Sequence, residues 1–227
     1  MISIIVPIYN EETTIRDFIY NLYCLYDIKK HEVIFVDGGS KDKTLDILEE
    51  LSHFGYSFYV SPKKGRANQM NFGAEISHGD ILWFVHADSV LQKDVIQKVI
   101  DCPTEVGCLK IKFYPNSFPM RVNSIVSNMR ASITNLAFGD QALFLSRQAF
   151  EKVGGYKDMP IMEDYRISED LSANGYKITV IDSSVTTSTR RYKGHVKKTM
   201  WQMQKYQKMY RRGVPVEEIA KMYRDVR

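Results

Sequence analysis

Three acidic sites in this sequence are candidates for ligand binding, metal binding or proton transfer. They are Asp37, Asp88 and the pair Glu163-Asp164. Asp88 follows the strongly hydrophobic run 81–85, and a carboxylate there could bind Mg²⁺ or Mn²⁺ against phosphate oxygens. Asp164 could act as a general base, because a carboxylate that takes a proton from a hydroxyl nucleophile accelerates transfer by about 10²–10⁴-fold. Stabilising a helix N-terminus is the alternative role for Asp88 and for Glu163-Asp164.

The elements that would position these residues follow from the hydrophobic pattern. The run 2–8 is almost unbroken, which is typical of a strand buried on both faces of a parallel sheet. Segments with apolar residues at helical spacing follow the early strands, and the third of these helices covers 66–77. The strands predicted in this half of the chain are 2–8, 32–36, 56–60 and 81–85. This alternation predicts a parallel sheet covered by helices.

The pattern changes in the second half of the chain. Leu109, Ile111 and Phe113 alternate with lysines, which predicts a half-exposed antiparallel strand and therefore a mixed sheet. Segment 114–135 is compatible with a helix or with a mobile connection, and the pattern leaves both open. The remaining predicted elements are a strand at 141–145, helices at 147–153 and 163–173, short strands near 178 and 186, and helices within 196–227 interrupted at Gly213. We predict one α/β domain with a mixed, mainly parallel sheet flanked by helices.

Polar residues directly follow four of the predicted strands, and in open α/β sheets ligands bind beyond the carboxyl ends of strands. Singly, each motif has a local explanation: Asn10-Glu11 can cap the next helix, and Asp37-Gly38-Gly39 can be a turn. Together they favour a nucleoside diphosphate site, which needs polar groups for the base, a cation at the phosphates and basic side chains. The four motifs are Pro7-Ile8-Tyr9-Asn10-Glu11, Asp37-Gly38-Gly39-Ser40-Lys41-Asp42, 63–66, and His86-Ala87-Asp88.

Composition limits the partners and the compartment. The chain has 31 basic and 27 acidic residues, and its net charge of +4 is too small to indicate a nucleic-acid partner. Three cysteines without a CxxC pair predict reduced thiols in a cytoplasmic protein, and no apolar run approaches the roughly 20 residues that span a bilayer. The Lys- and Met-rich segment from 196 either packs on the domain or lies on a membrane surface. Arg190-Arg191 either stabilise leaving-group charge or form a solvated basic face.

A set of short motifs is distributed along the chain. It consists of Val6-Pro7-Ile8-Tyr9-Asn10-Glu11, Val36-Asp37-Gly38-Gly39-Ser40, Gly65-Arg66-Ala67 with Gln69, Asn71 and Gly73-Ala74, His86-Ala87-Asp88, Gly139-Asp140-Gln141, and Glu163-Asp164. This set resembles that of family 2 glycosyltransferases of the GT-A fold. The tail further resembles the short bacterial subgroup called selenodomain-associated transferases, through Thr187-Ser188-Thr189-Arg190-Arg191-Tyr192 and through Tyr210, Gly213-Val214-Pro215 and Tyr223-Arg224.

The resemblance implies an inverting single displacement on a UDP- or GDP-linked sugar, with Mn²⁺ or Mg²⁺ as the cofactor. It implies that Asp88 binds the metal and that Asp164, beside Glu163, deprotonates the acceptor. Two residues depart from the family pattern: His86 replaces the first acidic residue of the DxD motif, and Tyr192 replaces a tryptophan. The implied nucleotide-sugar contacts are Pro7, Tyr9, Asn10, Glu11, Asp37, Gly38, Arg66, Gln69, His86, Ala87, Asp140, Arg190 and Arg191.

We divide the predicted single domain 1–227 into a nucleotide-binding half, 1–90, an acceptor and catalytic half, 91–195, and C-terminal helices, 196–227. Acceptor contacts are expected from 114–135 and from the C-terminal helices. Basic residues near the tail would suit a lipid-linked or phosphorylated acceptor, in a cytoplasmic protein that is either free or peripheral at the inner face of the membrane.

Three other classes compete with a glycosyltransferase. A nucleotidyltransferase would need a Gly-rich phosphate loop after the first strand, where Pro7-Ile8-Tyr9 stands instead. A dinucleotide-dependent oxidoreductase would need GxGxxG at the first helix, and this sequence has none there. A sugar-nucleotide-binding or regulatory protein with a decayed site is the third class, and His86 is the residue that favours it.

Overall fold

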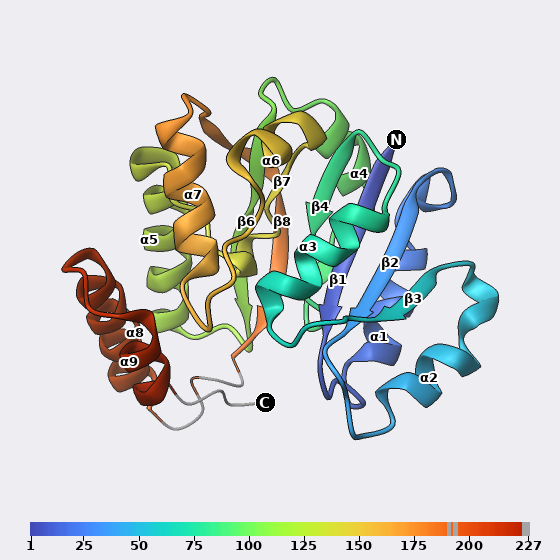
Figure 1. Cartoon of the computed structure of the whole chain (residues 1–227), viewed down its shortest axis with the longest axis horizontal. Helices are drawn as coiled ribbons and strands as arrows, with labels where there is room; N and C mark the ends of the chain where they lie inside the picture. Colours follow the sequence, from blue (N-terminus) through green and yellow to red (C-terminus); the bar gives the residue numbers. More distant parts are fainter. Residues whose placement is uncertain (190–191, 193–194, 224–227) are drawn as a thin grey trace.

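The computed structural model describes residues 1–189, 192 and 195–223, and within them eight strands form one mixed sheet (Figure 1). The strand order is β3-β2-β1-β4-β7-β6-β8-β5. Strands β1 to β4 run parallel to their neighbours among these four, whereas β7 runs antiparallel to β4 and β6. This arrangement confirms the predicted fold class. The strands are β1 (Ile2–Ile8), β2 (Glu32–Asp37), β3 (Ser57–Val60), β4 (Ile81–Phe84), β5 (Val90–Leu91), β6 (Val106–Tyr114), β7 (Phe144–Ser146) and β8 (Ile178–Ser188).

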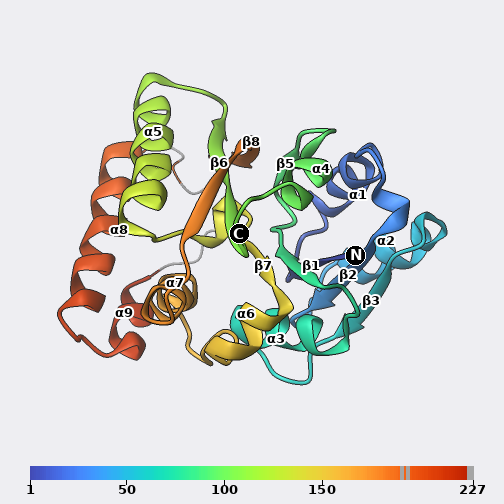
Figure 2. The ribbon, with the colours of Figure 1, turned by 90° about the horizontal axis from the view of Figure 1, so that it is seen from above.

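Helices cover both faces of the sheet, and Figure 2 shows α1 and α4 on one side and α3 and α6 on the other. Strand β1 divides its side chains between them: Ile4 and Val6 join a core cluster with Phe18 of α1, and Ile5 joins a second cluster with Met70 of α3. Burial on both faces explains the unbroken apolar run of β1. The helices are α1 (Ile15–Tyr23), α2 (Thr44–Glu50), α3 (Arg66–Ile76), α4 (Val95–Ile100), α5 (Phe118–Thr134), α6 (Arg147–Val153), α7 (Glu163–Ala173), α8 (Val196–Arg211) and α9 (Val216–Met222).

Gly73 allows α3 to lie close to the sheet, and its replacement by alanine should destabilise the fold. A Cβ atom there would lie 2.5 Å from Cγ2 of Ile5 and 3.1 Å from Cγ2 of Val36. Overpacking outweighs the gain in helix propensity, so we expect Gly73→Ala to lower the free energy of unfolding by about 1–2 kcal/mol in urea titrations. Glu75→Ala, at an exposed position of the same helix, is the matched control. An unchanged or higher midpoint for Gly73→Ala would contradict this packing.

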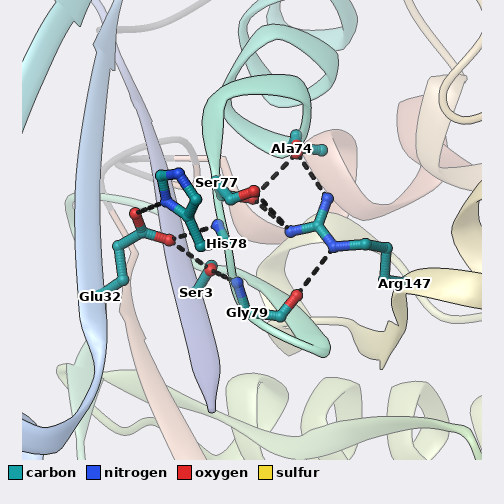
Figure 3. A network of polar contacts seen from close by, with 7 residues as sticks. All are labelled: Ser3, Glu32, Ala74, Ser77, His78, Gly79 and Arg147. Atoms are coloured by element: carbon teal, nitrogen blue, oxygen red, sulfur yellow. Dashed lines mark hydrogen bonds and ion pairs between the residues drawn. The ribbon is translucent and has the colours of Figure 1, made fainter.

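A polar network fixes the connection from α3 to β4 (Figure 3). The Glu32 carboxylate accepts hydrogen bonds from Ser3 Oγ at 2.6 Å and from the His78 backbone N–H at 2.9 Å. The Arg147 guanidinium donates from α6 to backbone carbonyls at the end of α3 and just beyond it, each at 2.9 Å, where the last carbonyls of a helix lack partners. These carbonyls belong to Ala74, Ser77 and Gly79. The network sets where β4 starts, and hence where Asp88 emerges.

Three strand predictions differ from the structure. The two short strands near 178 and 186 are one strand, β8, because it pairs in parallel with β6 over most of its length. The strand predicted at 141–145 begins only at Phe144, because Gly139–Gln141 forms a 3₁₀ turn and Ala142 has a left-handed φ of 48°. Strand β6 is antiparallel to β7, as predicted, but parallel to β8.

The structure gives the bounds of helices in two regions where the sequence pattern did not. The segment left open between helix and connection contains the 17-residue helix α5. The C-terminal region forms α8 and α9 on either side of Gly213, as predicted. No helix in residues 1–189 or 195–223 is both long enough and apolar enough to cross a membrane.

Candidate active site

A cavity of about 620 Å³ opens at the carboxyl ends of β1 and β4 and extends to α5, α7 and α8. Its wall contains most of the predicted site residues: Pro7, Tyr9, Glu11, Arg66, Gln69, His86, Ala87, Asp88, Asp140 and Asp164. Four further predicted residues, Asn10, Asp37, Gly38 and Glu163, are not among the described residues that line it. The predicted contacts Arg190 and Arg191 lie outside the described residues.

Asp37 is only 1% exposed and anchors the turn that follows β2. Its Oδ2 accepts hydrogen bonds from the backbone N–H groups of Gly39 at 2.7 Å and Ser40 at 2.9 Å, and Ser40 Oγ donates to Oδ1. These three hydrogen bonds engage both oxygens of the carboxylate. In this structure Asp37 therefore shapes the loop beside the cavity.

Asn10 does not cap a helix, and that prediction was wrong. Helix α1 begins at Ile15, and Asn10 has a left-handed φ of 54°. Its Oδ1 accepts a hydrogen bond from the Lys41 backbone N–H at 2.8 Å, and its own N–H donates to Ser40 Oγ at 2.8 Å. Pairing between the β1 and β2 loops is a non-local contact, which helix-capping rules do not anticipate.

Gln69 joins α3 to the ends of two strands. It is 5% exposed, and its Nε2 donates to the backbone carbonyls of Ile8 and Val36, each at 2.7 Å. These carbonyls stand at the ends of β1 and β2, so one side chain sets the spacing of both strand ends and the helix. Gly38 lies against it, since a Cβ at Gly38 would be 3.1 Å from the Gln69 amide.

Arg66 at the start of α3 forms ion pairs with both acidic residues at the start of α7. Its Nη2 lies 2.9 Å from Oδ2 of Asp164, and its Nε contacts Oε1 of Glu163. The Glu163 side chain is 3% exposed and the Asp164 side chain 13%. Met162, with a left-handed φ of 70°, turns the chain into α7 so that both carboxylates face α3.

Asp164 has one engaged oxygen and one oxygen without a partner. Its Oδ1 is buried and has no hydrogen-bond partner in the described part of the chain. Burial raises the pKa of Asp164 to about 6; the Arg66 charge and a hydrogen bond from the Gly139 backbone oppose the rise, whereas the Glu163 charge adds to it. A carboxylate with a pKa near neutrality, lining a cavity, has the properties of a general base.

Gly139 brings His86 close to Asp164. A Cβ at Gly139 would lie 2.7 Å from Nε2 of His86 and 2.8 Å from Oδ2 of Asp164, so only glycine fits between them without a shift. His86 therefore stands on the same side of the cavity as the candidate base. Gly139 belongs to the motif Gly139-Asp140-Gln141, but no local pattern in the sequence explains why glycine is needed there.

Arg130 of α5 is a site residue that the sequence did not predict. Its Nη2 donates to Oε1 of Gln141 at 2.9 Å, and its guanidinium carbon lies 3.7 Å from the centre of the Phe138 ring. Arg130 and Phe138 line the cavity, and burial lowers the pKa of Arg130. No local signal marks Arg130, because it lies in the segment that the pattern could not assign.

Comparison with known proteins shows which family the first part of the chain resembles. The profile described as glycosyl transferase family 2 matches residues 3–102, which contain β1 without its first residue, β2 to β5, and α1 to α4. Residues 3–102 are thus similar to the glycosyltransferase family 2 domain. Curated relatives agree: "Probable glycosyltransferase YdaM" of Bacillus subtilis is 24% identical over 82% of this chain, and a "Probable glycosyltransferase" of Sulfolobus acidocaldarius is 25% identical over 89%. The chain spans about half the length of each, 50% and 49%.

Solved structures share the GT-A glycosyltransferase fold. A mannosyltransferase from Pyrobaculum calidifontis, in complex with GDP-Man and Mn²⁺, has a TM-score of 0.71 at 20% identity, and the match covers 91% of this chain and 61% of that one. Staphylococcus aureus TarS in complex with UDP-GlcNAc has a TM-score of 0.68 at 18% identity, covering 86% and 60%. At these identities the comparison establishes the fold.

The cavity is compatible with a divalent cation that shares its ligands with a bound phosphate group. Across the residues that the structure describes, no three His, Cys, Asp or Glu side chains are arranged to hold a metal ion by themselves. Mg²⁺ commonly binds through one or two carboxylates, substrate phosphates and water, which requires no protein cage. Asp88 lines the cavity at the end of β4 and offers one such carboxylate. One carboxylate at this place fits a hard cation whose other ligands are phosphate oxygens and water.

Proposed function

We propose that this glycosyltransferase transfers a sugar from a nucleoside diphosphate sugar to an acceptor hydroxyl in one inverting displacement, with Asp164 as the general base. Asp164 carries the proposal: it lines the cavity, its Oδ1 has no partner among the described residues, and its pKa is raised to about 6. Asp164 takes the hydroxyl proton while the acceptor oxygen bonds to the anomeric carbon. The bond to the diphosphate breaks, and its electron pair leaves with the diphosphate.

Arg66 and Glu163 position the base. Arg66 holds Oδ2 of Asp164 at 2.9 Å, which leaves Oδ1 for the acceptor hydroxyl. Glu163 is buried against the same guanidinium and so restricts where Arg66 can lie. Orientation of this kind is a large part of catalysis, because a near-attack geometry replaces a random encounter.

The donor would occupy the end of the cavity near β1 and β4. Pro7, Tyr9 and Glu11 line this end and are candidates for contacts with the nucleotide, and Asp88 would hold Mn²⁺ or Mg²⁺ at the diphosphate. A bound cation stabilises the negative charge of the leaving diphosphate. The GDP-Man and Mn²⁺ complex of the P. calidifontis mannosyltransferase supports this assignment, and the UDP-GlcNAc complex of TarS supports the nucleotide-sugar class.

The acceptor would occupy the end between α5 and α8. This end combines cations, Arg130 and Arg211, with apolar side chains, Val126, Met200 and Met203. Such a wall suits an acceptor with an apolar part and a phosphate, as in a lipid-linked or phosphorylated acceptor. It also supports the proposed division of the chain into a donor half, 1–90, and acceptor-binding parts, 91–195 and 196–227.

A donor-hydrolysis screen tests the proposed function. We expect slow Mn²⁺-dependent release of UDP or GDP from one class of nucleotide sugars, with water as a substitute acceptor, and release at least about 10²-fold slower by Asp164→Asn. The second candidate, a decayed nucleotide-sugar-binding protein, is favoured by His86 in place of an acidic DxD residue. Calorimetric binding of a nucleotide sugar, without turnover on any donor or on a panel of lipid-phosphate acceptors, would establish that alternative.

A further inference from the structure

Helix α5 has an apolar face that is open to solvent. We call this face the α5 stripe: Phe118, Val122, Ile125, Met129 and Ile133, which are 79%, 40%, 58%, 54% and 75% exposed. Their spacing of three or four residues places them along one side of the helix. Met120 and Ala131, on the inward side, are buried. Helix α5 thus needs its inward residues for the core and retains a second apolar face.

The α5 stripe borders the mouth of the cavity. Val126 of α5 and Trp201 of α8 both line the cavity, yet they are 52% and 65% exposed. Figure 2 shows α5 and α8 beside each other at the end of the molecule opposite β3. Lys205 of α8 stacks over Trp201, with Nζ 5.7 Å from the ring centre. Apolar, aromatic and cationic side chains therefore share this end.

The segments that contain α5 and α8 are rich in basic residues. Residues 106–139, which include α5, and residues 195–212, which include α8, contain 10 of the 31 basic residues and none of the 27 acidic residues. The rest of the chain is therefore net negative, although the whole chain is +4. A positive surface with an exposed apolar stripe is complementary to an anionic surface that offers hydrocarbon beneath its charges.

We propose that the α5 stripe, with Trp201, Lys205 and Lys208 of α8, docks on an anionic phospholipid surface. Apolar side chains would enter the boundary between headgroups and acyl chains, and the lysines would contact lipid phosphates. A second copy of the chain is a poorer occupant, because it would bring the same positive charge to the contact. Docking does not depend on the reaction proposed for the cavity, and it places the cavity mouth at the lipid surface.

Vesicle co-sedimentation tests the docking. We expect the full chain to sediment with vesicles of equal parts phosphatidylglycerol and phosphatidylcholine, to bind them less at high salt, and to remain in the supernatant with phosphatidylcholine alone. Ile125→Glu places a charge on the stripe and should reduce the bound fraction by at least about tenfold. Ile100→Glu on α4, where Ile100 is 46% exposed and distant from the stripe, is the matched control and should bind as the parent does.

Circular dichroism and thermal unfolding establish that the variants are folded. Should Ile125→Glu fail to fold, the double variant Lys205→Glu and Lys208→Glu, at exposed positions of α8, replaces it and should also lose vesicle binding. Absence of binding to anionic vesicles, or equal binding by the parent and the stripe variant, would overturn the proposal. A dimer in sedimentation velocity that Ile125→Glu dissociates, without vesicle binding, would identify a second copy as the occupant instead.

Discussion

Asp164→Asn should lower kcat by at least about 10²-fold while leaving nucleotide affinity nearly unchanged. The amide preserves the size of the side chain and can still contact Arg66, but it cannot take the acceptor proton. Arg66, which lies 2.9 Å from Asp164 Oδ2, should keep α3 and α7 in register. Steady-state kinetics with the donor found by the hydrolysis screen, and calorimetry with UDP or GDP, measure the two quantities separately.

The pH profile provides an independent check of the same role. Because the pKa of Asp164 is about 6, the base is protonated and inactive below that pH, and kcat/KM should rise through about pH 6 to a plateau. The residual activity of Asp164→Asn should lack this limb. Asp170→Asn makes the same substitution on α7, at a residue paired with Arg166. This control should retain both the turnover of the parent and the rise of kcat/KM with pH. Near-normal turnover by Asp164→Asn would exclude Asp164 as the base.

Asp88→Ala should abolish the stimulation of transfer by Mn²⁺ and lower kcat by roughly 10²–10³-fold, the usual effect of removing a group that stabilises leaving-group charge. The Asp88 carboxylate is the proposed link between protein and cation, so its loss should also remove the gain in nucleoside diphosphate affinity that Mn²⁺ provides. Calorimetry with GDP or UDP, with and without Mn²⁺, measures that gain directly.

Asp94→Ala is the matched control for the metal assignment. Asp94 precedes α4 and pairs with Lys98 at 2.8 Å, and it is not among the described residues that line the cavity. Its replacement should leave the Mn²⁺ dependence intact. If Asp88→Ala retained full Mn²⁺-dependent affinity and turnover, another residue would have to hold the cation, and His86 would be the first to test.

Much of the fold could be predicted because its signals are local. The bounds of β1, α6 and α7 match the predictions of 2–8, 147–153 and 163–173. Each has a pattern that one element satisfies alone: an unbroken apolar run for a strand covered on both faces, or apolar residues at helical spacing that end at glycine or asparagine. Because ligands bind beyond the carboxyl ends of strands in open α/β sheets, the sequence also predicted that Asp88 and Arg66 share one site, and both line the cavity.

The errors occurred where distant segments compete for the same groups. Asn10 has the side chain of a helix cap, but its oxygen is taken by the Lys41 backbone, 31 residues away. The 178–188 region has a weak strand pattern, and pairing with β6 made it one strand rather than two. Propensity describes what a segment prefers alone, and tertiary pairing can override it.

The sequence by itself determined the fold class, the order of strands and helices up to β4, and the carboxylates at their ends, because hydrophobic periodicity and turn chemistry act over a few residues. The short elements β5 and α4 were not predicted. Only the tertiary structure decided that Arg66 holds Asp164 across 98 residues, that Asp37 is occupied by its own turn, and that Gly139 lies between His86 and Asp164. It also decided that one apolar face of α5 stays uncovered. A sequence pattern shows which face of a helix is apolar, but whether that face is buried depends on which distant elements reach it.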